Sequence, residues 1–171
     1  EYDKLRAKAE PFREKFAAFS MGLPLLSSTE DMQEICRFYN KEFPREDGEA
    51  LVLMGHGTTH FANAVYPAMS YIFSEMGFER IFVGAVEGYP DIEIVRKELK
   101  RLDVEKVIVT PLMLVAGDHA VNDMAGEEPD SWKSLLESDG YTVGTVVRGL
   151  GEYPPVRERY LAHLRQAMER E

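Results

Sequence analysis

A nearly continuous apolar run from Val107 to Val115 constrains the fold of this chain more than any other feature. Its β-branched residues predict a strand that is covered on both faces, as in a parallel sheet. The run is followed by Gly117-Asp118-His119, so a histidine comes soon after the strand. Open parallel sheets bind ligands outside the carboxyl ends of their strands, which makes His119 a candidate for chemistry. Alternatively, Asp118 caps a helix and His119 is a solvated residue of its first turn.

Short apolar runs alternate with helical patterns along the rest of the chain. Runs at 50–54, 81–86 and 141–147 predict further strands, and alternating apolar residues predict one more over 16–26. Apolar residues at helical spacing predict helices near 2–17, 29–43, 61–76, 90–102, 131–137 and 154–167. This alternation predicts an α/β fold with a mostly parallel sheet flanked by helices on both faces.

The domain organisation is predicted from two features near the amino terminus. The polar turn at 44–49 is the best boundary, and it divides the chain into 1–46 and 47–171. Helical spacing already begins at Tyr2, and no capping residue precedes it. We therefore expect that the chain starts inside a helix and that something upstream is missing.

Composition excludes several classes of partner. The 171 residues are 44% apolar and 29% charged, which suits an ordered domain, and the net charge of −10 argues against nucleic acid or an anionic membrane. No apolar run is long enough for a transmembrane helix, and we find no signal peptide. The single cysteine, Cys36, excludes an internal disulfide and a thiolate-cluster metal site, and it is compatible with the cytoplasmic location that we expect.

Polar side chains stand at the ends of three predicted strands: His56, Glu87 and His119. The carboxyl ends of parallel strands meet at one edge of a sheet, so two imidazoles and a carboxylate can converge on one cleft. These side chains suit a first-row divalent metal ion such as cobalt, nickel, iron or zinc. Histidine also titrates near neutral pH, so the same residues suit proton transfer.

Each of these residues also has a simpler interpretation. In this interpretation His56, which lies between two glycines, is a turn residue. Glu87 is a solvated acid or part of a helix N-terminus. The residues alone leave open an α/β protein with either a metal site or an acid–base site, and they name no substrate.

Four other residues receive structural predictions. We place His60 at the rim of the site and His163 on the surface, off the apolar stripe of the last helix. Cys36 is predicted to be a buried, inert thiol. Trp132 is predicted to anchor the core, with the lining of a flat ligand's pocket as the alternative.

Several segments together resemble the anaerobic sirohydrochlorin cobaltochelatases. The longest is Pro111-Leu112-Met113-Leu114-Val115-Ala116-Gly117-Asp118-His119. The others lie at 23–28, 54–57, 84–90, 122–125, 130–133 and 149–152. The resemblance covers nearly the whole chain, although it corresponds only to the C-terminal part of the longer family members.

This resemblance implies a class II chelatase with two similar α/β halves and a cleft between them. Such an enzyme inserts Co²⁺ into sirohydrochlorin without ATP or another nucleotide, and some relatives use Fe²⁺; Ni²⁺ is a further alternative. The family's metal-binding and catalytic histidines fall on His56 and His119, and its acidic partner falls on Glu87. Because only part of the family's length is present, we expect that this chain alone is inactive.

The substrate of the resembled family raises a question of charge. Sirohydrochlorin carries many carboxylates while this chain is acidic, so we expect local cations, with Lys133 and Arg148 as candidates. The alternatives are a sirohydrochlorin ferrochelatase, a module that binds a metal or tetrapyrrole without turnover, and a metal-assisted hydrolase. A homo-oligomer is left open.

Overall fold

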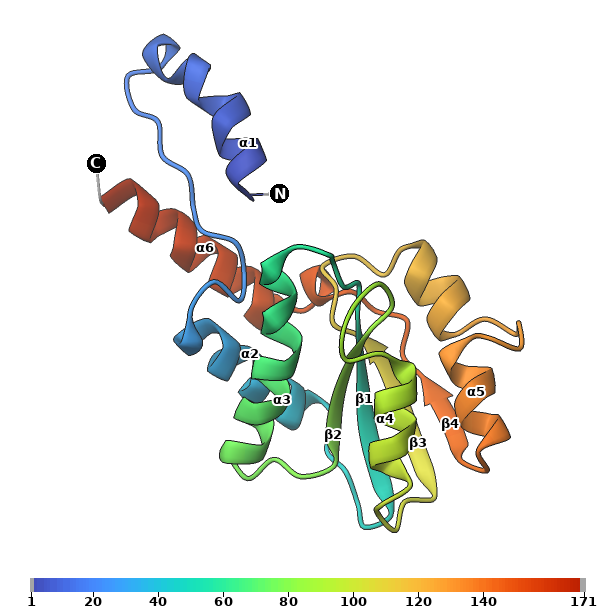
Figure 1. Cartoon of the computed structure of the whole chain (residues 1–171). Helices are drawn as coiled ribbons and strands as arrows, with labels where there is room; N and C mark the ends of the chain where they lie inside the picture. The colour runs from blue at the N-terminus through green and yellow to red at the C-terminus, as the bar shows by residue number, and fades with distance from the viewer. Residues whose placement is uncertain (1, 170–171) are drawn as a thin grey trace.

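The computed structural model describes residues 2–169, and its centre is a parallel sheet of four strands (Figure 1). The strands are β1 (Glu49–Gly55), β2 (Ile81–Ala85), β3 (Lys106–Pro111) and β4 (Thr142–Thr145). Their order in the sheet is β2-β1-β3-β4, and every neighbouring pair is parallel. The predicted α/β fold with a parallel sheet is confirmed.

Helices cover both faces of this sheet (Figure 1). One face carries α2 (Thr29–Glu42), α3 (Val65–Glu75) and the start of α6 (Pro154–Glu169), and the other carries α4 (Ile92–Leu99) and α5 (Trp132–Ser138). Successive strand side chains point to opposite faces, so Leu51 and Leu53 join the first cluster while Val52 and Met54 join the second.

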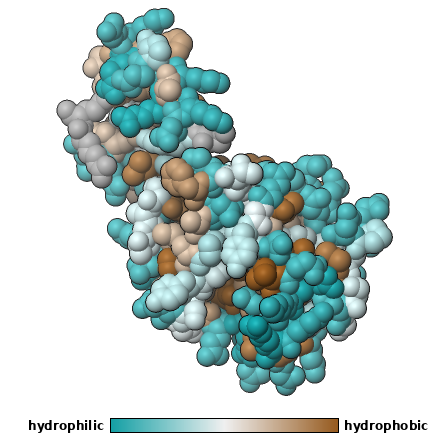
Figure 2. All heavy atoms as spheres, in the orientation of Figure 1, coloured by the Kyte–Doolittle hydropathy of each residue, from teal (hydrophilic) through white to brown (hydrophobic). Residues whose placement is uncertain are grey.

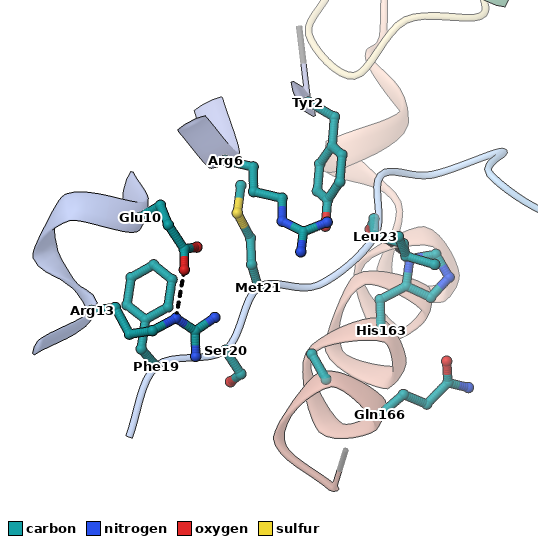
Figure 3. A pocket seen from close by; sticks show the side chains of 11 residues that line it. Tyr2, Arg6, Glu10, Arg13, Phe19, Ser20, Met21, Leu23, His163 and Gln166 are labelled. Atoms are coloured by element: carbon teal, nitrogen blue, oxygen red, sulfur yellow. Dashed lines mark hydrogen bonds and ion pairs between the residues drawn. The ribbon is translucent and has the colours of Figure 1, made fainter. Parts of the chain in front are cut away.

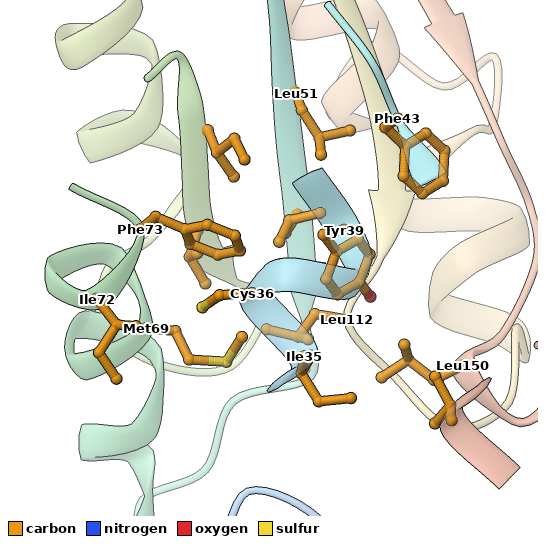
Figure 4. Packing of buried hydrophobic residues seen from close by; sticks show 14 of the residues in the cluster. Ile35, Cys36, Tyr39, Phe43, Leu51, Met69, Ile72, Phe73, Leu112 and Leu150 are labelled. Atoms are coloured by element: carbon orange, nitrogen blue, oxygen red, sulfur yellow. The ribbon is translucent and has the colours of Figure 1, made fainter. Parts of the chain in front are cut away.

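The first cluster is the larger of the two cores. Figure 4 shows residues of α2 and α3 packed against β1, with Cys36 and Tyr39 fully buried among them. The Tyr39 hydroxyl donates a hydrogen bond to the carbonyl oxygen of Pro111, 2.7 Å away, which fixes α2 to the end of β3. The buried position predicted for Cys36 is confirmed.

Capping residues explain where several helices begin. Ser28, Asp91 and Ser131 are the N-caps of α2, α4 and α5, and each side chain accepts a hydrogen bond from a backbone amide in the first turn. Trp132, at the start of α5, is buried in the second cluster, so its predicted role in the core is confirmed. Pro67 lies in the first turn of α3, where the missing amide hydrogen costs little, and a short helix η2 (Phe61–Ala64) precedes it.

The segment before α2 stands apart from the sheet (Figure 1). It contains α1 (Tyr2–Ala9) and the 3₁₀ helix η1 (Glu10–Lys15), and neither has a buried residue. Figure 2 shows this segment as a separate, mostly hydrophilic lobe. The predicted helix over 2–17 is thus divided after Ala9, close to Pro11. The predicted start of the chain inside a helix depends on Glu1, which lies outside the described residues.

The strand predicted over 16–26 is wrong. This segment has no regular secondary structure, and it runs beside α6 instead of beside a strand. A Cβ at Gly22 would lie only 3.4 Å from the backbone of His163, and the carbonyl oxygen of Leu23 lies 2.8 Å from Nδ1 of the same histidine. The backbone of this segment thus lies against α6 and forms no ladder with a strand.

The strand predicted from Val107 to Val115 is shorter than expected and ends at Pro111. Pro111 has no amide hydrogen to continue the ladder. The chain then turns, and the carbonyl oxygens of Met113 and Leu114 accept hydrogen bonds from the amides of Leu150 and Gly151. This turn positions the segment that carries His119.

None of the helices within residues 2–169 is long and apolar enough to cross a membrane.

Candidate functional site

The topology of the sheet creates a crevice between the ends of β1 and β3. The chain leaves β1 toward α3 on one face, and it leaves β3 toward α5 on the other face. Connections that diverge in this way leave a gap at the carboxyl edge, where open α/β sheets bind ligands. His56 follows β1 and His119 lies in the connection after β3, so both candidates lie at this crevice.

The structure brings the two histidines into contact. Their ring centroids are 4.6 Å apart and the rings are nearly perpendicular, at 88°. Glu87 follows β2, and its Oε2 atom lies 3.9 Å from Nδ1 of His56. The three residues predicted from the strand ends are therefore neighbours in space. Their side chains are partly exposed, at 50% for His56, 61% for Glu87 and 30% for His119, so a ligand can reach them.

Close backbone packing holds His56 in place. Gly57 has a φ of +86°, and a Cβ there would lie 2.5 Å from the carbonyl carbon of Glu87, so only glycine fits. The amide of Glu87 donates to the carbonyl oxygen of His56 at 2.7 Å. The amide of Gly57 donates to the hydroxyl of Tyr66 at 3.1 Å. The loops after β1 and β2 thus form one unit.

Asn63 strengthens the connection between these loops. Its side-chain oxygen accepts from the amide of Thr58 at 3.1 Å, and its side-chain nitrogen donates to the carbonyl oxygen of Tyr89 at 2.7 Å. A Cβ at Gly88 would lie 2.3 Å from Oδ1 of Asn63, so a larger residue there would have to displace this side chain. His60 is exposed and its Nδ1 accepts from the amide of Ala62, so it caps η2 at the rim of the site.

The hydrogen bonds of the imidazoles define which nitrogen is open. Nδ1 of His56 lies 3.0 Å from the carbonyl oxygen of Gly57, and Nδ1 of His119 is hydrogen-bonded to the carboxylate of Asp123. Both partners are acceptors, so both Nδ1 atoms carry the hydrogen. Within residues 2–169, neither Nε2 atom has a hydrogen-bond partner. Each ring therefore presents a free Nε2 lone pair, the arrangement typical of histidines that bind metals.

The described residues do not form a complete metal cage. Within residues 2–169, no three His, Cys, Asp or Glu side chains are grouped closely enough to hold a metal ion on their own. Two imidazoles and an exposed carboxylate can still supply some ligands and leave coordination positions open for another molecule.

Exposed apolar side chains occur in the same connections that carry His56, Glu87 and His119. Phe61 and Tyr89 lie on the loops after β1 and β2, and they are 84% and 62% exposed. Val115 and Val121 lie on either side of His119 and are 70% and 52% exposed. Such apolar side chains can make contact with a flat apolar ligand.

The two cations proposed from the sequence already have partners. Lys133 lies 2.6 Å from a carboxylate oxygen of Glu127, and this hydrogen bond raises the pKa of Lys133. Arg148 lies over the ring of Tyr153 and donates to the carbonyl oxygen of Glu152. Both would have to exchange these contacts to bind a substrate carboxylate.

A cavity of about 410 Å³ lies away from this site, between the N-terminal segment and α6 (Figure 3). His163 is one of its lining residues, but its side chain is only 7% exposed. Nδ1 of His163 lies 2.8 Å from the carbonyl oxygen of Leu23, and Nε2 lies 2.9 Å from a carboxylate oxygen of Asp31. The predicted surface position of His163 is wrong, because both ring nitrogens are used within the fold. We therefore assign the site to the strand ends.

Asp123 is the residue of the site that the sequence interpretation missed. It lies four residues after His119, a spacing that places side chains together on one helical face. The signal was therefore present in the sequence, since the alternative interpretation already placed His119 in the first turn of a helix, but the pairing with Asp123 was not drawn from it.

The fold and the site define a class: an α/β protein with paired, half-exposed histidines at the switch point of a parallel sheet. A sequence model of the cobalt chelatase (CbiK) family matches residues 1–169. This chain belongs to the cobalt chelatase (CbiK) family.

Two curated relatives agree with this assignment. The sirohydrochlorin cobaltochelatase of Salmonella typhimurium is 38% identical over 169 residues, which are 98% of this chain and 64% of that protein. The sirohydrochlorin cobaltochelatase CbiKC of Nitratidesulfovibrio vulgaris is 36% identical over 172 residues, which are 98% of this chain and 61% of that protein. The chain thus spans less than two thirds of the length of these relatives.

Solved structures share the fold. SirB from Bacillus subtilis with Fe³⁺ matches with a TM-score of 0.64 and 15% identity, over 96% of this chain and 64% of that chain. The putative cobalamin biosynthesis protein CbiX from Marinobacter aquaeolei matches with a TM-score of 0.56 and 17% identity, over 71% of this chain and 96% of that chain. At these identities the comparison supports the architecture alone.

Proposed function

We propose that this chain carries the metal-handling part of an enzyme that inserts Co²⁺ into sirohydrochlorin without ATP. The relatives' names supply the reaction. The observation that carries the proposal is the contact between His56 and His119, each with Nδ1 bonded and Nε2 free. We also retain as a proposal the division of the chain into 1–46, the end of the N-terminal chelatase half with the crossover helix, and 47–171, the C-terminal chelatase-like α/β half.

The reaction replaces two inner N–H hydrogens of the macrocycle with one Co²⁺ ion and releases two protons. His56 and His119 would hold the incoming ion through Nε2 and leave its other coordination positions to the pyrrole nitrogens. A histidine that has released the ion can then accept a pyrrole proton, because a neutral imidazole is a good base near pH 7.

Glu87 would act beside His56 as a third ligand or as a partner for the imidazolium. Its carboxylate is 61% exposed and lies on the Nδ1 side of the ring. This position suits compensation of the charge of an imidazolium, whereas a role as third ligand requires the side chain to turn toward the Nε2 side, where the ion would bind. The exposed side chains of Phe61, Tyr89 and Val115 would contact the apolar face of the macrocycle.

An incomplete cage fits an ion that is a substrate. A complete set of ligands would hold the ion too tightly to transfer it, whereas two imidazoles leave room for the macrocycle to take over coordination. Ligand type alone does not select Co²⁺ over Fe²⁺ or Ni²⁺, because such sites follow the general affinity order of these ions. A sirohydrochlorin ferrochelatase is therefore the second candidate.

Absorbance spectroscopy with sirohydrochlorin and Co²⁺ tests the proposal. We expect the full product of the gene to shift the tetrapyrrole bands to those of the metallated product, faster than the uncatalysed reaction. Parallel reactions with Fe²⁺ and Ni²⁺ rank the metals. A stable unmetallated complex would instead support a binding module, and failure to bind the tetrapyrrole at all would rule out both.

A further inference from the structure

We infer that Asp123 is a positioning residue that fixes the imidazole of His119 with its hydrogen on Nδ1. The inference rests on the proposed function in one respect: the proposed role of Nε2 of His119 as a metal ligand. The hydrogen bond between His119 and Asp123 is observed in the connection after β3 and does not depend on that function.

A distorted helical turn places the two side chains together. Residues Ala120–Met124 form a π-helix, η3, and His119 immediately precedes it. In this wider turn the carboxylate of Asp123 is hydrogen-bonded to Nδ1 of His119. Single π-helical turns are rare and occur frequently at functional sites.

The turn is anchored firmly enough to hold the pair. Ala120 and Met124 are fully buried in the second cluster, between the sheet and α5. The turn ends where the amide of Gly126 donates to the carbonyl oxygen of Asn122 at 3.0 Å. A Cβ at Gly126 would lie 2.3 Å from that oxygen, so glycine is required to close the turn. The backbones of His119 and Asp123 are thus held by residues that do not touch a ligand.

A carboxylate at this position has a specific effect on the ring. In a neutral imidazole one nitrogen carries hydrogen and the other carries the lone pair, and the partner of the first decides which is which. Asp123 can only accept, so it holds the hydrogen on Nδ1 and directs the lone pair to Nε2. His56 obtains the same result from the carbonyl oxygen of Gly57, which is neutral. The two rings therefore receive equivalent tautomers from different partners.

The same turn offers a matched control. Asp118 and Asn122 are also four residues apart, and Asn122 Nδ2 donates to Asp118 Oδ1 at 2.8 Å. This pair is exposed and it lies one position before the pair of His119 and Asp123. Asp118→Ala removes a carboxylate from the same turn without removing the partner of His119.

The test is nitrogen-15 NMR of the histidine rings, recorded over a pH series, because the nitrogen shifts of a neutral ring distinguish hydrogen on Nδ1 from hydrogen on Nε2. In the unaltered chain we expect His119 to carry hydrogen on Nδ1. Asp123→Ala will shift the ring toward a mixture with the Nε2–H form, whereas Asp118→Ala will leave the spectrum of His119 unchanged. Asp123→Asn retains an oxygen acceptor and will largely restore the Nδ1–H form. Thermal unfolding confirms that each variant is folded, as the 45% exposure of the Asp123 side chain leads us to expect.

Titration of the same chain with Co²⁺ measures the consequence. We expect Asp123→Ala to weaken Co²⁺ binding roughly 10- to 100-fold and Asp118→Ala to leave it unchanged. Hydrogen on Nε2 of His119 in the unaltered chain, or a tautomer unaffected by Asp123→Ala, overturns the inference. A tautomer that shifts while Co²⁺ affinity stays constant upholds the positioning role of Asp123 and removes His119 from the proposed metal site.

Discussion

The histidines of this molecule occupy two contrasting environments. At the sheet edge, His56 and His119 are partly exposed, each has one bonded nitrogen, and their rings touch. Between α2 and α6, His163 is buried, and both its nitrogens are bonded, to Leu23 and to Asp31. Histidine is thus a candidate metal ligand at the sheet edge and a packed, hydrogen-bonded residue between α2 and α6.

The difference follows from what surrounds each ring. The connections after β1 and β3 supply one acceptor to each imidazole, and within residues 2–169 the second nitrogen has no hydrogen-bond partner. In the buried region Asp31 is completely inaccessible, and it also accepts hydrogen bonds from Arg159 at 2.6 and 3.2 Å. A buried carboxylate needs such donors, so His163 is committed to stabilising the fold. The candidate site at the sheet edge is therefore distinguished by histidine Nε2 atoms that are unpaired among the described residues, and not by the presence of histidine alone.

The largest effect should come from the sheet edge. In the full product of the gene, His119→Ala or His56→Ala should lower the rate of Co²⁺ insertion about 10²- to 10⁴-fold, because each removes a ligand and a proton acceptor. The melting temperature should change little, since both side chains are partly exposed. Absorbance assays and thermal unfolding measure the two quantities. Unchanged turnover in both variants would show that these histidines take no part in the reaction.

The buried region should give the opposite result. His163→Ala removes a donor from Asp31 and opens a cavity, so we expect a loss of about 3 kcal/mol in the free energy of unfolding. Chemical denaturation of the chain measures this loss. His163→Gln provides the control, because its amide can still donate to Asp31 and should recover part of the stability. If folded His163→Ala inserts Co²⁺ at the normal rate, His163 serves the fold and not the reaction, as we expect. A loss of turnover without a loss of stability would contradict this assignment.

Strand ends were sufficient to predict that three polar side chains lie together, but local patterns were not sufficient to predict the buried cluster of His163 and Asp31. His56, Glu87 and His119 follow apolar runs, and the parallel sheet obliges such ends to meet at one edge. His163 lies off the apolar stripe of α6, and its partners Asp31 and Leu23 are more than 130 residues away. A local sequence pattern cannot predict these contacts, because they depend on how α2, α6 and the linker before α2 pack together. The false strand over 16–26 has the same origin, because the backbone of this linker lies against α6, far away in the sequence.

Substitution of Asp139 tests the loss of a buried carboxylate's ionic contacts where no histidine is involved. Its carboxylate accepts from Arg96 at 2.6 and 2.9 Å and lies 2.8 Å from Lys100, and no histidine takes part. The hydrogen bond from Arg96 lowers the pKa of Asp139 to about 2. We expect Asp139→Asn to cost about 1–3 kcal/mol at neutral pH.

The pH dependence of this cost has a defined sign. The folded pKa lies below the ordinary value of 3.8, so the stabilisation is complete above about pH 5 and is lost as the pH falls through about 2. Denaturation of both proteins between neutral pH and pH 2 should therefore show their difference shrinking on acidification. A difference that stays constant over this range would mean that the pair contributes nothing through charge.

The smallest expected effect concerns the cap of the helix that carries Asp31. The Ser28 hydroxyl accepts from the Asp31 amide at 3.1 Å, so Ser28→Ala should cost about 1 kcal/mol. Cys36 reports on the same helix, because burial raises the pKa of its thiol to about 12 and makes it unreactive until α2 opens. Labelling with a thiol reagent should therefore be about fivefold faster in Ser28→Ala.

Asp91 provides the matched cap on the opposite face of the sheet, where its side chain accepts from the Ile94 amide at 3.0 Å. If α2 opens locally, Asp91→Ala will destabilise the chain by a similar amount and accelerate the labelling of Cys36 less than Ser28→Ala does. Equal acceleration by the two variants would mean that the thiol is exposed only by global unfolding. In that case the helix bearing Asp31 has no independent motion, and the buried region responds to a lost cap as one cooperative unit with the sheet edge.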